Sequence, residues 1–343
     1  MKEERQRLNA PASENVRLDA PIGHGMRVFL VFLVCCAVLV AVFAVSRILP
    51  LRRSGGASPE VTGGSMASAE DATSGQPSET DAPIPDGAVA IRTVDLSGDA
   101  FRNETSYVID PVAVRALFGG DTRRFSPEEP VVLILHTHAQ EGYRTDGTPY
   151  LTGGIGDAIY TEDHATGVVA VGEVLCRELM RGGVPAIHCT DLHGEGGTLR
   201  GAYDGAAECI RRYMEEYPSI AYVIDLHRDS VLSADGACLR TLSESGSAQI
   251  MAVVGSDGGG EACPAWRENL GLALTLSECL NAASAGVSRP VLLRNATYNQ
   301  EIAPHSLLLE IGSAGNTVTE AKSAAVLVGK VLAELLCGRD SGQ

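Results

Sequence analysis

The sequence predicts an α/β domain, built on a mostly parallel sheet with helices on both faces and preceded by one transmembrane helix. Three observations lead to this prediction. Short apolar runs such as Val131–Leu135 have the pattern of strands that are buried on both faces. Amphipathic segments with helical spacing alternate with these runs, which is typical of βαβ units. A long uncharged apolar run lies near the N-terminus.

The length and charge of the chain limit the classes of function. Its 343 residues are enough for one good-sized domain and additional segments. The net charge of −16 argues against a nucleic-acid partner, because nucleic acid is bound mainly through Lys and Arg contacts to phosphate. The acidic surface also repels anionic lipid headgroups, so attachment to a membrane requires hydrophobic insertion.

The N-terminal part predicts a membrane anchor. Residues 1–26 are polar, and residues 27–50 contain the uncharged run Val28–Val45. As a helix this run is about 27 Å long, close to the ~30 Å hydrocarbon core of a bilayer. A cleaved signal peptide is the alternative, but the run exceeds a usual apolar h-region and no clear small-residue cleavage site precedes Arg52 and Arg53. The basic residues before the run favour a cytoplasmic N-terminus and an extracytoplasmic C-terminal region.

Three further regions follow the anchor. Residues 51–87 are rich in Gly, Ser, Pro and acidic residues and predict a flexible linker. Residues 88–130 are a preface to the main domain, with a predicted strand at Val89–Leu96 and a short helix at Pro111–Phe118. The catalytic candidate domain is then 131–343.

Within this domain, glycine and proline mark the ends of most helices. Gly182 and Gly183 end the first, Pro218 follows the second, and Pro264 precedes the third. The predicted helices are Gly167–Arg181, Leu199–Tyr217, Ala265–Ala283 and Val318–Leu336. The predicted strands after Val131–Leu135 are Val184–Ile187, Ile220–Leu226, Val291–Leu293 and Ser306–Ile311. Gly236–Leu242 and Ala248–Gly255 are expected to pair as a hairpin-like addition.

Three of the predicted strands end in polar side chains. His136, His138 and Glu141 follow the first, His227 follows Ile220–Leu226, and Glu310 lies near the end of the last. In open α/β sheets the carboxyl ends of strands form the ligand-binding edge. Imidazole and carboxylate are ligands of catalytic zinc, which keeps one position open for water. The pattern therefore predicts a Zn²⁺ site made of one of the first two histidines with Glu141 and His227, with Glu310 as general base.

The remaining histidines and the cysteines give weaker signals. His24, His164, His188, His193 and His305 lack a strand-end setting and are interpreted as surface or structural residues. The nine cysteines include no C-x-x-C pair, and several fall on apolar helix faces, where Cys acts as a small hydrophobe. A disulfide between Cys238 and Cys263 is compatible with an extracytoplasmic location, although spacing alone does not pair them.

Several segments resemble one protein family. VLILHTHAQE, YVIDLHRDS, WRENL and SRPVLLRNATYNQEIAPHSLLLEIGSAGNTVTEA occur in this order between Val131 and Leu336. They are similar to the stage II sporulation protein P family of cell-wall hydrolases. The resemblance implies a zinc amidase-like fold and cleavage of the peptidoglycan amide between N-acetylmuramic acid and the stem peptide. The family is also associated with endopeptidase activity on cross-links.

The resemblance also implies roles for individual residues. Glu141, His227 and one of His136 and His138 match the zinc ligands, and Glu310 matches the catalytic acid/base. The strand-end position favours His136, whereas alignment with the commoner amidases puts their histidine nearer His138. Four further residues match family segments and are implied to contact glycan or peptide: Arg228, Tyr298, Asn299 and Gln300.

The resemblance also implies partners, and two positions differ from the family pattern. The family acts during engulfment in sporulation beside a lytic transglycosylase and a membrane protein, so partners of these kinds are implied. Gly142 stands where a Ser is common in the family, and the region Tyr203–Gly205 lacks the usual Ser. These departures leave a second reading, in which the chain is a wall-binding or scaffolding module whose hydrolase site has decayed.

Overall fold

A computed structural model describes most of the chain after the predicted linker. The described residues are 84–119, 125–144, 149–152, 160–193 and 201–338. The predicted segments 1–26 and 27–50 lie outside these residues, as does nearly all of the predicted linker. Within the described ranges, no helix is long and apolar enough to cross a membrane.

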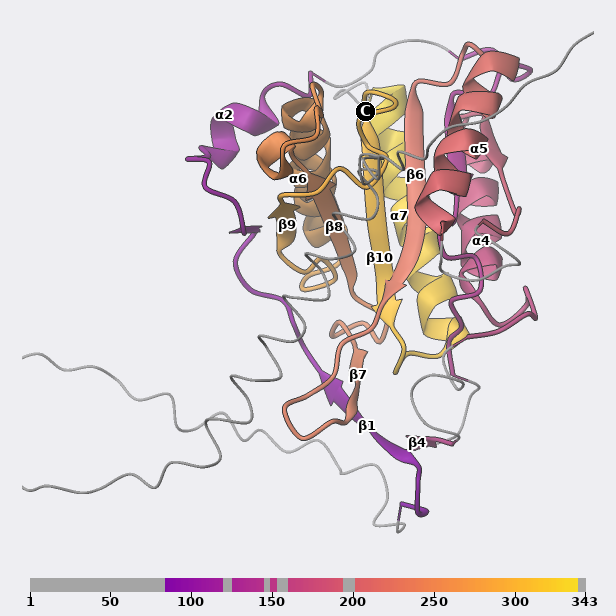
Figure 1. Cartoon of the computed structure of the whole chain (residues 1–343), viewed down its shortest axis with the longest axis vertical. Coiled ribbons are helices and arrows are strands. Elements are labelled where there is room, and N and C mark those ends of the chain that lie inside the picture. Colours follow the sequence, from indigo (N-terminus) through magenta and orange to yellow (C-terminus); the bar gives the residue numbers. More distant parts are fainter. Residues whose placement is uncertain (1–83, 120–124, 145–148, 153–159, 194–200, 339–343) are drawn as a thin grey trace, which may run out of the picture. The chain divides into compact units, whose positions relative to one another are not determined.

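Seven strands form the main sheet, in the order β2-β9-β8-β10-β6-β3-β5 (Figure 1). Their bounds are β2 Phe101–Asn103, β3 Val132–Leu135, β5 Ala186–His188, β6 Tyr222–Asp229, β8 Ile250–Gly255, β9 Val291–Arg294 and β10 Ser306–Ser313. Neighbouring strands are parallel except β8 and β10, so the two parts of the sheet run in opposite directions. The predicted α/β class is confirmed, but the sheet is mixed rather than mostly parallel. The reversal arises because no helix connects β6 to β8, and parallel pairing usually needs such a crossover.

A smaller sheet has the order β4-β1-β7, with β4 Tyr150–Leu151, β1 Val89–Val94 and β7 Cys238–Thr241. The predicted hairpin of residues 236–242 with 248–255 is limited to one antiparallel bridge, between Leu242 and Ala248. β7 pairs in parallel with β1, whereas β8 lies between β9 and β10 in the main sheet. The almost entirely apolar sequence of β8, IMAVVG, suits a strand inside a sheet better than one strand of a surface hairpin.

Helices cover the two faces of the main sheet unequally. The helices are α2 Pro111–Arg115, α4 Val168–Arg181, α5 Ala202–Glu216, α6 Trp266–Ala283 and α7 Val318–Cys337. Residues of α4, α6 and α7 share one large apolar core with the sheet, and α5 packs on the opposite face (Figure 1). The side chains of β3 alternate between these faces: Val132 and Ile134 belong to the large core, and Leu133 and Leu135 lie under α5.

The α5 face of the sheet continues beyond α5 over β10, β8 and β9. Its side chains there form a small cluster made of Val253, Leu292 and Leu308, with Met251 and Tyr298 partly buried against it. None of these residues belongs to a helix of the described chain. This part of the sheet is the floor of the pocket described next.

Candidate metal and catalytic site

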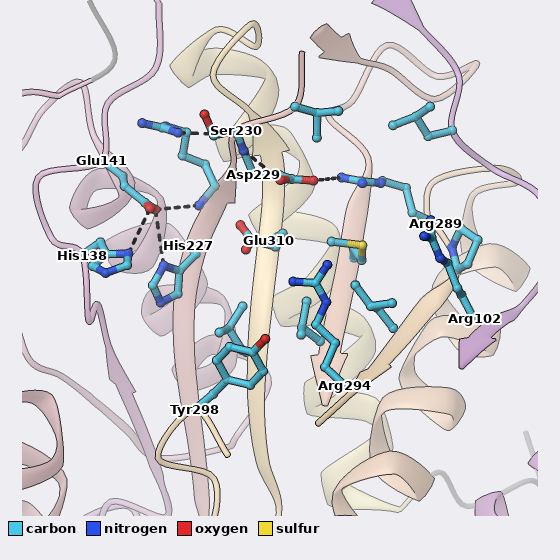
Figure 2. A pocket seen from close by; sticks show the side chains of 18 of the residues that line it. Arg102, His138, Glu141, His227, Asp229, Ser230, Arg289, Arg294, Tyr298 and Glu310 are labelled. Carbon is cyan, nitrogen blue, oxygen red and sulfur yellow. Dashed lines mark hydrogen bonds and ion pairs between the residues drawn. The ribbon is translucent and has the colours of Figure 1, made fainter. Parts of the chain in front are cut away.

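A pocket of about 630 Å³ lies over the uncovered part of the sheet and extends to the ends of β3 and β6 (Figure 2). Its chemistry-bearing side chains fall into two groups. One group lies beside β6 and β10: His138, Glu141, His227 and Glu310. The other lies beside β9 and β2: Arg102, Arg289 and Arg294. The pocket therefore runs across the strands.

The register of β6 and β10 explains why the first group meets. Glu310 lies opposite His227, and Leu308 lies opposite Asp225. Since alternate residues of a strand share a face, all four side chains lie on the side of the sheet that carries the pocket. His138 and Glu141 reach the same place from the loop that follows β3.

His138, Glu141 and His227 form a compact group of metal donors. The two oxygens of Glu141 lie between the histidines, with Oε1 3.3 Å from His138 Nδ1 and Oε2 3.4 Å from His227 Nδ1. One donor atom from each residue lies within 4.8 Å of the other two. Two imidazoles and a carboxylate are a donor set of catalytic zinc sites, which leave a further position open. The residues present therefore fit a bound Zn²⁺.

The electrostatics of this group favour a bound cation. Burial raises the pKa of Glu141, but the charge of His227 and hydrogen bonds from both histidines outweigh it, so the pKa lies well below its usual value. The backbone N–H of Arg228 also donates to Glu141 Oε2 at 2.9 Å. Burial lowers the pKa of His227, but Asp225 and Glu141 raise it well above its usual value. Metal binding to this group would therefore release a proton.

Asp225 holds His227 in place, and the sequence analysis did not identify it. Its Oδ1 lies 3.0 Å from His227 Nε2, on the side of the ring away from Glu141. Thr137 fixes the carboxylate by donating its backbone N–H at 2.8 Å and its hydroxyl at 2.6 Å. A carboxylate behind a metal-binding histidine orients the ring and makes it a better ligand. The available signal was the spacing Asp-x-His in a strand, which puts both side chains on one face.

His136 does not join the donor group, contrary to the preference that its strand-end position suggested. It continues the alternation of Val132 and Ile134, which puts it on the opposite face of the sheet. There its Nδ1 is 2.8 Å from Leu226 O and its Nε2 is 2.7 Å from His188 Nε2. Burial lowers the pKa of His136 to about 3 and that of His188 to about 4, so both rings are neutral. A Cβ at Gly172 of α4 would lie 2.7 Å from each ring, so only glycine fits there.

Glu310 lies beside the donor group but is not part of it. Its Oε2 is buried and has no hydrogen-bond partner among the described residues. Burial raises the pKa of Glu310 to about 8; His227 and Arg289 oppose this shift, while the charges of Glu141 and Asp229 add to it. A carboxyl group held near neutral pKa is suited to accept and return a proton.

The four residues implied to contact substrate lie in different places. Arg228 and Tyr298 line the pocket. The Arg228 guanidinium donates to Gly142 O at 2.8 Å, which ties the end of β6 to the loop that carries Glu141. Asn299 donates to Tyr203 O at 2.8 Å and lines a neighbouring hollow. Gln300 is 2% exposed and bonds the β8 backbone at Val253 and Gly255, so it supports the pocket floor without facing the pocket.

Several other pocket residues were not found by the sequence analysis. Tyr203, on α5, packs edge-on against His138 with ring centroids 5.5 Å apart. Arg102, Arg289 and Arg294 come from two distant parts of the chain that meet through the pairing of β2 with β9. No local motif marks these residues, because only the sheet order brings them together.

The chain matches a known protein family and a curated relative. A family model described as Stage II sporulation protein P (SpoIIP) matches residues 66–333. A curated stage II sporulation protein P of Bacillus subtilis (strain 168) is 27% identical over 218 residues, which cover 61% of this chain and 51% of the relative. The chain thus spans about half the length of that relative.

Solved structures with similarity to the chain include an N-acetylmuramyl-L-alanine amidase and a second amidase. The apo form of Ami1 from Mycobacterium abscessus has a TM-score of 0.36 and 17% identity, over 61% of this chain and 99% of that one. CwlD from Clostridioides difficile, in complex with the GerS lipoprotein, has a TM-score of 0.36 and 15% identity, over 60% of this chain and 98% of that one.

The family model covers most of the chain and includes every strand of the main sheet and all the donor residues described above. The resemblance carried by the segments around His138, His227 and Glu310 is thereby confirmed. The chain belongs to the stage II sporulation protein P family.

Proposed function

We propose that this protein is a zinc-dependent peptidoglycan hydrolase, an N-acetylmuramoyl-L-alanine amidase, that cleaves the amide between N-acetylmuramic acid and the stem peptide. The observation that carries the proposal is the meeting of His138, Glu141 and His227 in a pocket beside the unpartnered carboxyl oxygen of Glu310. Three donors and one separate carboxylate are the parts that metal-assisted hydrolysis requires.

Each residue has one task in this proposal. His138, Glu141 and His227 would hold Zn²⁺, whose Lewis acidity polarises an amide carbonyl and makes water more acidic. Glu310 accepts a proton from the attacking water and then donates it to the leaving amine. Asp225 and Thr137 keep the His227 ring in orientation. The backbone N–H of Arg228 fixes Glu141.

The uncovered face of the sheet accounts for a polymeric substrate. The pocket extends from His138 across β10, β8 and β9 to Arg102 on the edge strand β2. A stem peptide is extended and carries carboxylates, so its length fits a groove across the strands and its charge fits the arginines. Because cross-linked peptides share these properties, cleavage of cross-links is the second activity to measure.

The place of action follows from the predicted anchor. We propose that the single-pass segment 27–50 fixes the protein in the cell membrane and that residues 131–343 act outside the cytoplasm during engulfment, beside a lytic transglycosylase and a membrane scaffold protein. Protease added to intact protoplasts should then digest the domain, and protease confined to the cytoplasmic side of membrane vesicles should not. Digestion from the cytoplasmic side alone would contradict this location and the wall substrate.

Digestion of purified peptidoglycan tests the activity. The zinc-loaded protein should release free stem peptides without new reducing sugar ends, lose this activity to a chelator and regain it with added Zn²⁺. Peptide release by the zinc-free protein would contradict the proposed site. Wall binding with no bond cleaved in the presence of zinc would instead support the decayed wall-binding module.

A further inference from the structure

A second cluster of metal donors lies outside the pocket lining, where α5 packs near the end of β5. Cys189 directly follows β5, His193 lies four residues later, and Cys209 lies on α5. One donor atom from each lies within 4.8 Å of the other two, and all three residues are buried. The sulfur atoms of the cysteines are 3.1 Å apart and are not joined as a disulfide.

The imidazole distinguishes this cluster from a pair of packed thiols. His193 is 8% exposed, and its Nε2 has no hydrogen-bond partner among the described residues. A buried polar atom without a partner is costly, and it usually indicates an ion or water that completes the site. One nitrogen of the ring lies within 4.8 Å of both sulfur atoms, so the ring lies against the cysteines.

Arg212 and Asp191 lie beside the sulfur atoms. Arg212 lies with Nη2 3.8 Å from Cys209 Sγ and 2.6 Å from Asp191 Oδ2. Such contacts beside metal-binding side chains orient the ligands. The same Arg212 nitrogen contacts Asp191 Oδ2 and Cys209 Sγ, so the Asp191 carboxylate lies next to the cluster.

We propose that Cys189, His193 and Cys209 bind a second zinc ion, which is structural and independent of the site at His138, Glu141 and His227. Two thiolates and an imidazole are a soft donor set that selects Zn²⁺ over Mg²⁺ or Ca²⁺. Movement of the Asp191 carboxylate onto the ion would close the coordination, as in structural zinc sites.

The position of the cluster defines its role. The metal would tie the end of β5 to α5, and the first turn of α5 carries Tyr203, whose ring packs on His138. The ion would therefore hold one wall of the pocket against a ligand of the first site. This role does not depend on the reaction that the pocket carries out.

Cobalt substitution of the full-length protein separates the two sites. Co²⁺ bound to thiolate gives an intense near-ultraviolet charge-transfer band, whereas Co²⁺ bound to histidine and carboxylate does not. The band should therefore appear in the wild type and persist in His227→Ala. The band should disappear in Cys209→Ser. It should become weaker in His193→Gln, which is the milder change. The His227→Ala change leaves the sulfur cluster intact. Absence of the band from this folded variant would therefore overturn the proposal.

Zinc content gives a second readout that does not involve activity. Wild-type protein should hold about one equivalent more zinc than Cys209→Ser. Cys263→Ser is the matched control, because Cys263 is equally buried but belongs to the large apolar core. Equal zinc content in the wild type and Cys209→Ser would contradict the proposal. So would a Cys189–Cys209 disulfide found by peptide mapping of the zinc-loaded wild type.

Discussion

The two ends of the pocket differ in burial, charge and origin (Figure 2). At one end, the donor group and Glu310 lie on or next to β3, β6 and β10 and are held by buried contacts. At the other end, the side chains of Arg102 and Arg294 are 70% and 48% exposed and pair with Glu104 near the chain surface. Arg289 lies between the ends and pairs with Asp229 at 2.8 Å.

The difference suggests separate tasks for the two ends of the pocket. Rigid strand ends fix groups to well-defined positions, which a metal site and a proton acceptor require. Exposed arginines adapt to a ligand at little cost, which suits recognition of carboxylates. We therefore expect changes at the first end to alter turnover and metal binding, and changes at the second end to alter substrate binding.

Replacing His227 by Ala should abolish the activity. The change removes a metal ligand and leaves Glu141 and Asp225 buried without the ring that lies between them. Zinc at the pocket and peptide release should be lost together, to the level of the chelated protein. His164→Ala is the matched control, since His164 is an exposed histidine that does not line the pocket. Full activity of the His227→Ala protein would contradict the assignment of metal binding and turnover to this end of the pocket.

Replacing Glu310 by Gln should lower kcat by about 10² to 10⁴ while zinc stays bound. Glutamine keeps the size of the side chain but cannot take a proton. Zinc content measured beside kcat decides the role of this residue. If the change empties the metal site, Glu310 is a ligand and Glu141 becomes the candidate for the base.

Replacing Asp225 by Asn should weaken zinc binding by about 10- to 100-fold and leave activity recoverable in excess zinc. The amide oxygen can still accept from Thr137, but the negative charge beside His227 is lost. Competition with a chelator of known affinity measures the change. Asp235→Asn, which alters an exposed aspartate outside the pocket lining, should bind zinc like the wild type.

Replacing Arg294 by Ala should raise KM about tenfold, the value of one charged hydrogen bond, with little change in kcat. Kinetics on a soluble muropeptide with a free stem-peptide carboxylate would measure both constants. Arg115→Ala is the matched control, because Arg115 is a partly exposed arginine that pairs with Glu278 outside the pocket lining. A fall in kcat at constant KM would show that the arginine end takes part in the chemical step.

Most residues at the donor-group end of the pocket could be predicted from the sequence, because each lies in or just after a recognisable apolar strand. Each of β3, β6 and β10 is an apolar run with a candidate site residue near its end or in the loop that follows, so the strand and the side chain are predicted together. The choice between His136 and His138 depends on which face of the sheet each side chain occupies. The alternation that puts Val132 and Ile134 under α4 continues to His136 and carries it to the wrong face.

The arginine end of the pocket could not be predicted, because its residues come together only through the order of the strands in the sheet. Arg102 and Arg294 are far apart in the chain and meet only because β2 pairs with β9. The reversal at β8 likewise depends on a connection without a helix, which an apolar run such as IMAVVG does not reveal. The sulfur cluster was missed for the same reason, since β5 and α5 bring its members together.

The pairing of β2 with β9 has a consequence for shortening the protein. β2 is the outermost strand of the main sheet, so its removal would leave the polar backbone groups of β9 uncovered on that side. A fragment that begins at Val131 would lack β2, and also β1 of the smaller sheet. Its new sheet margin would be a template for pairing between molecules, and thus a cause of aggregation. A fragment intended for crystals or for enzymology should therefore begin before Val89.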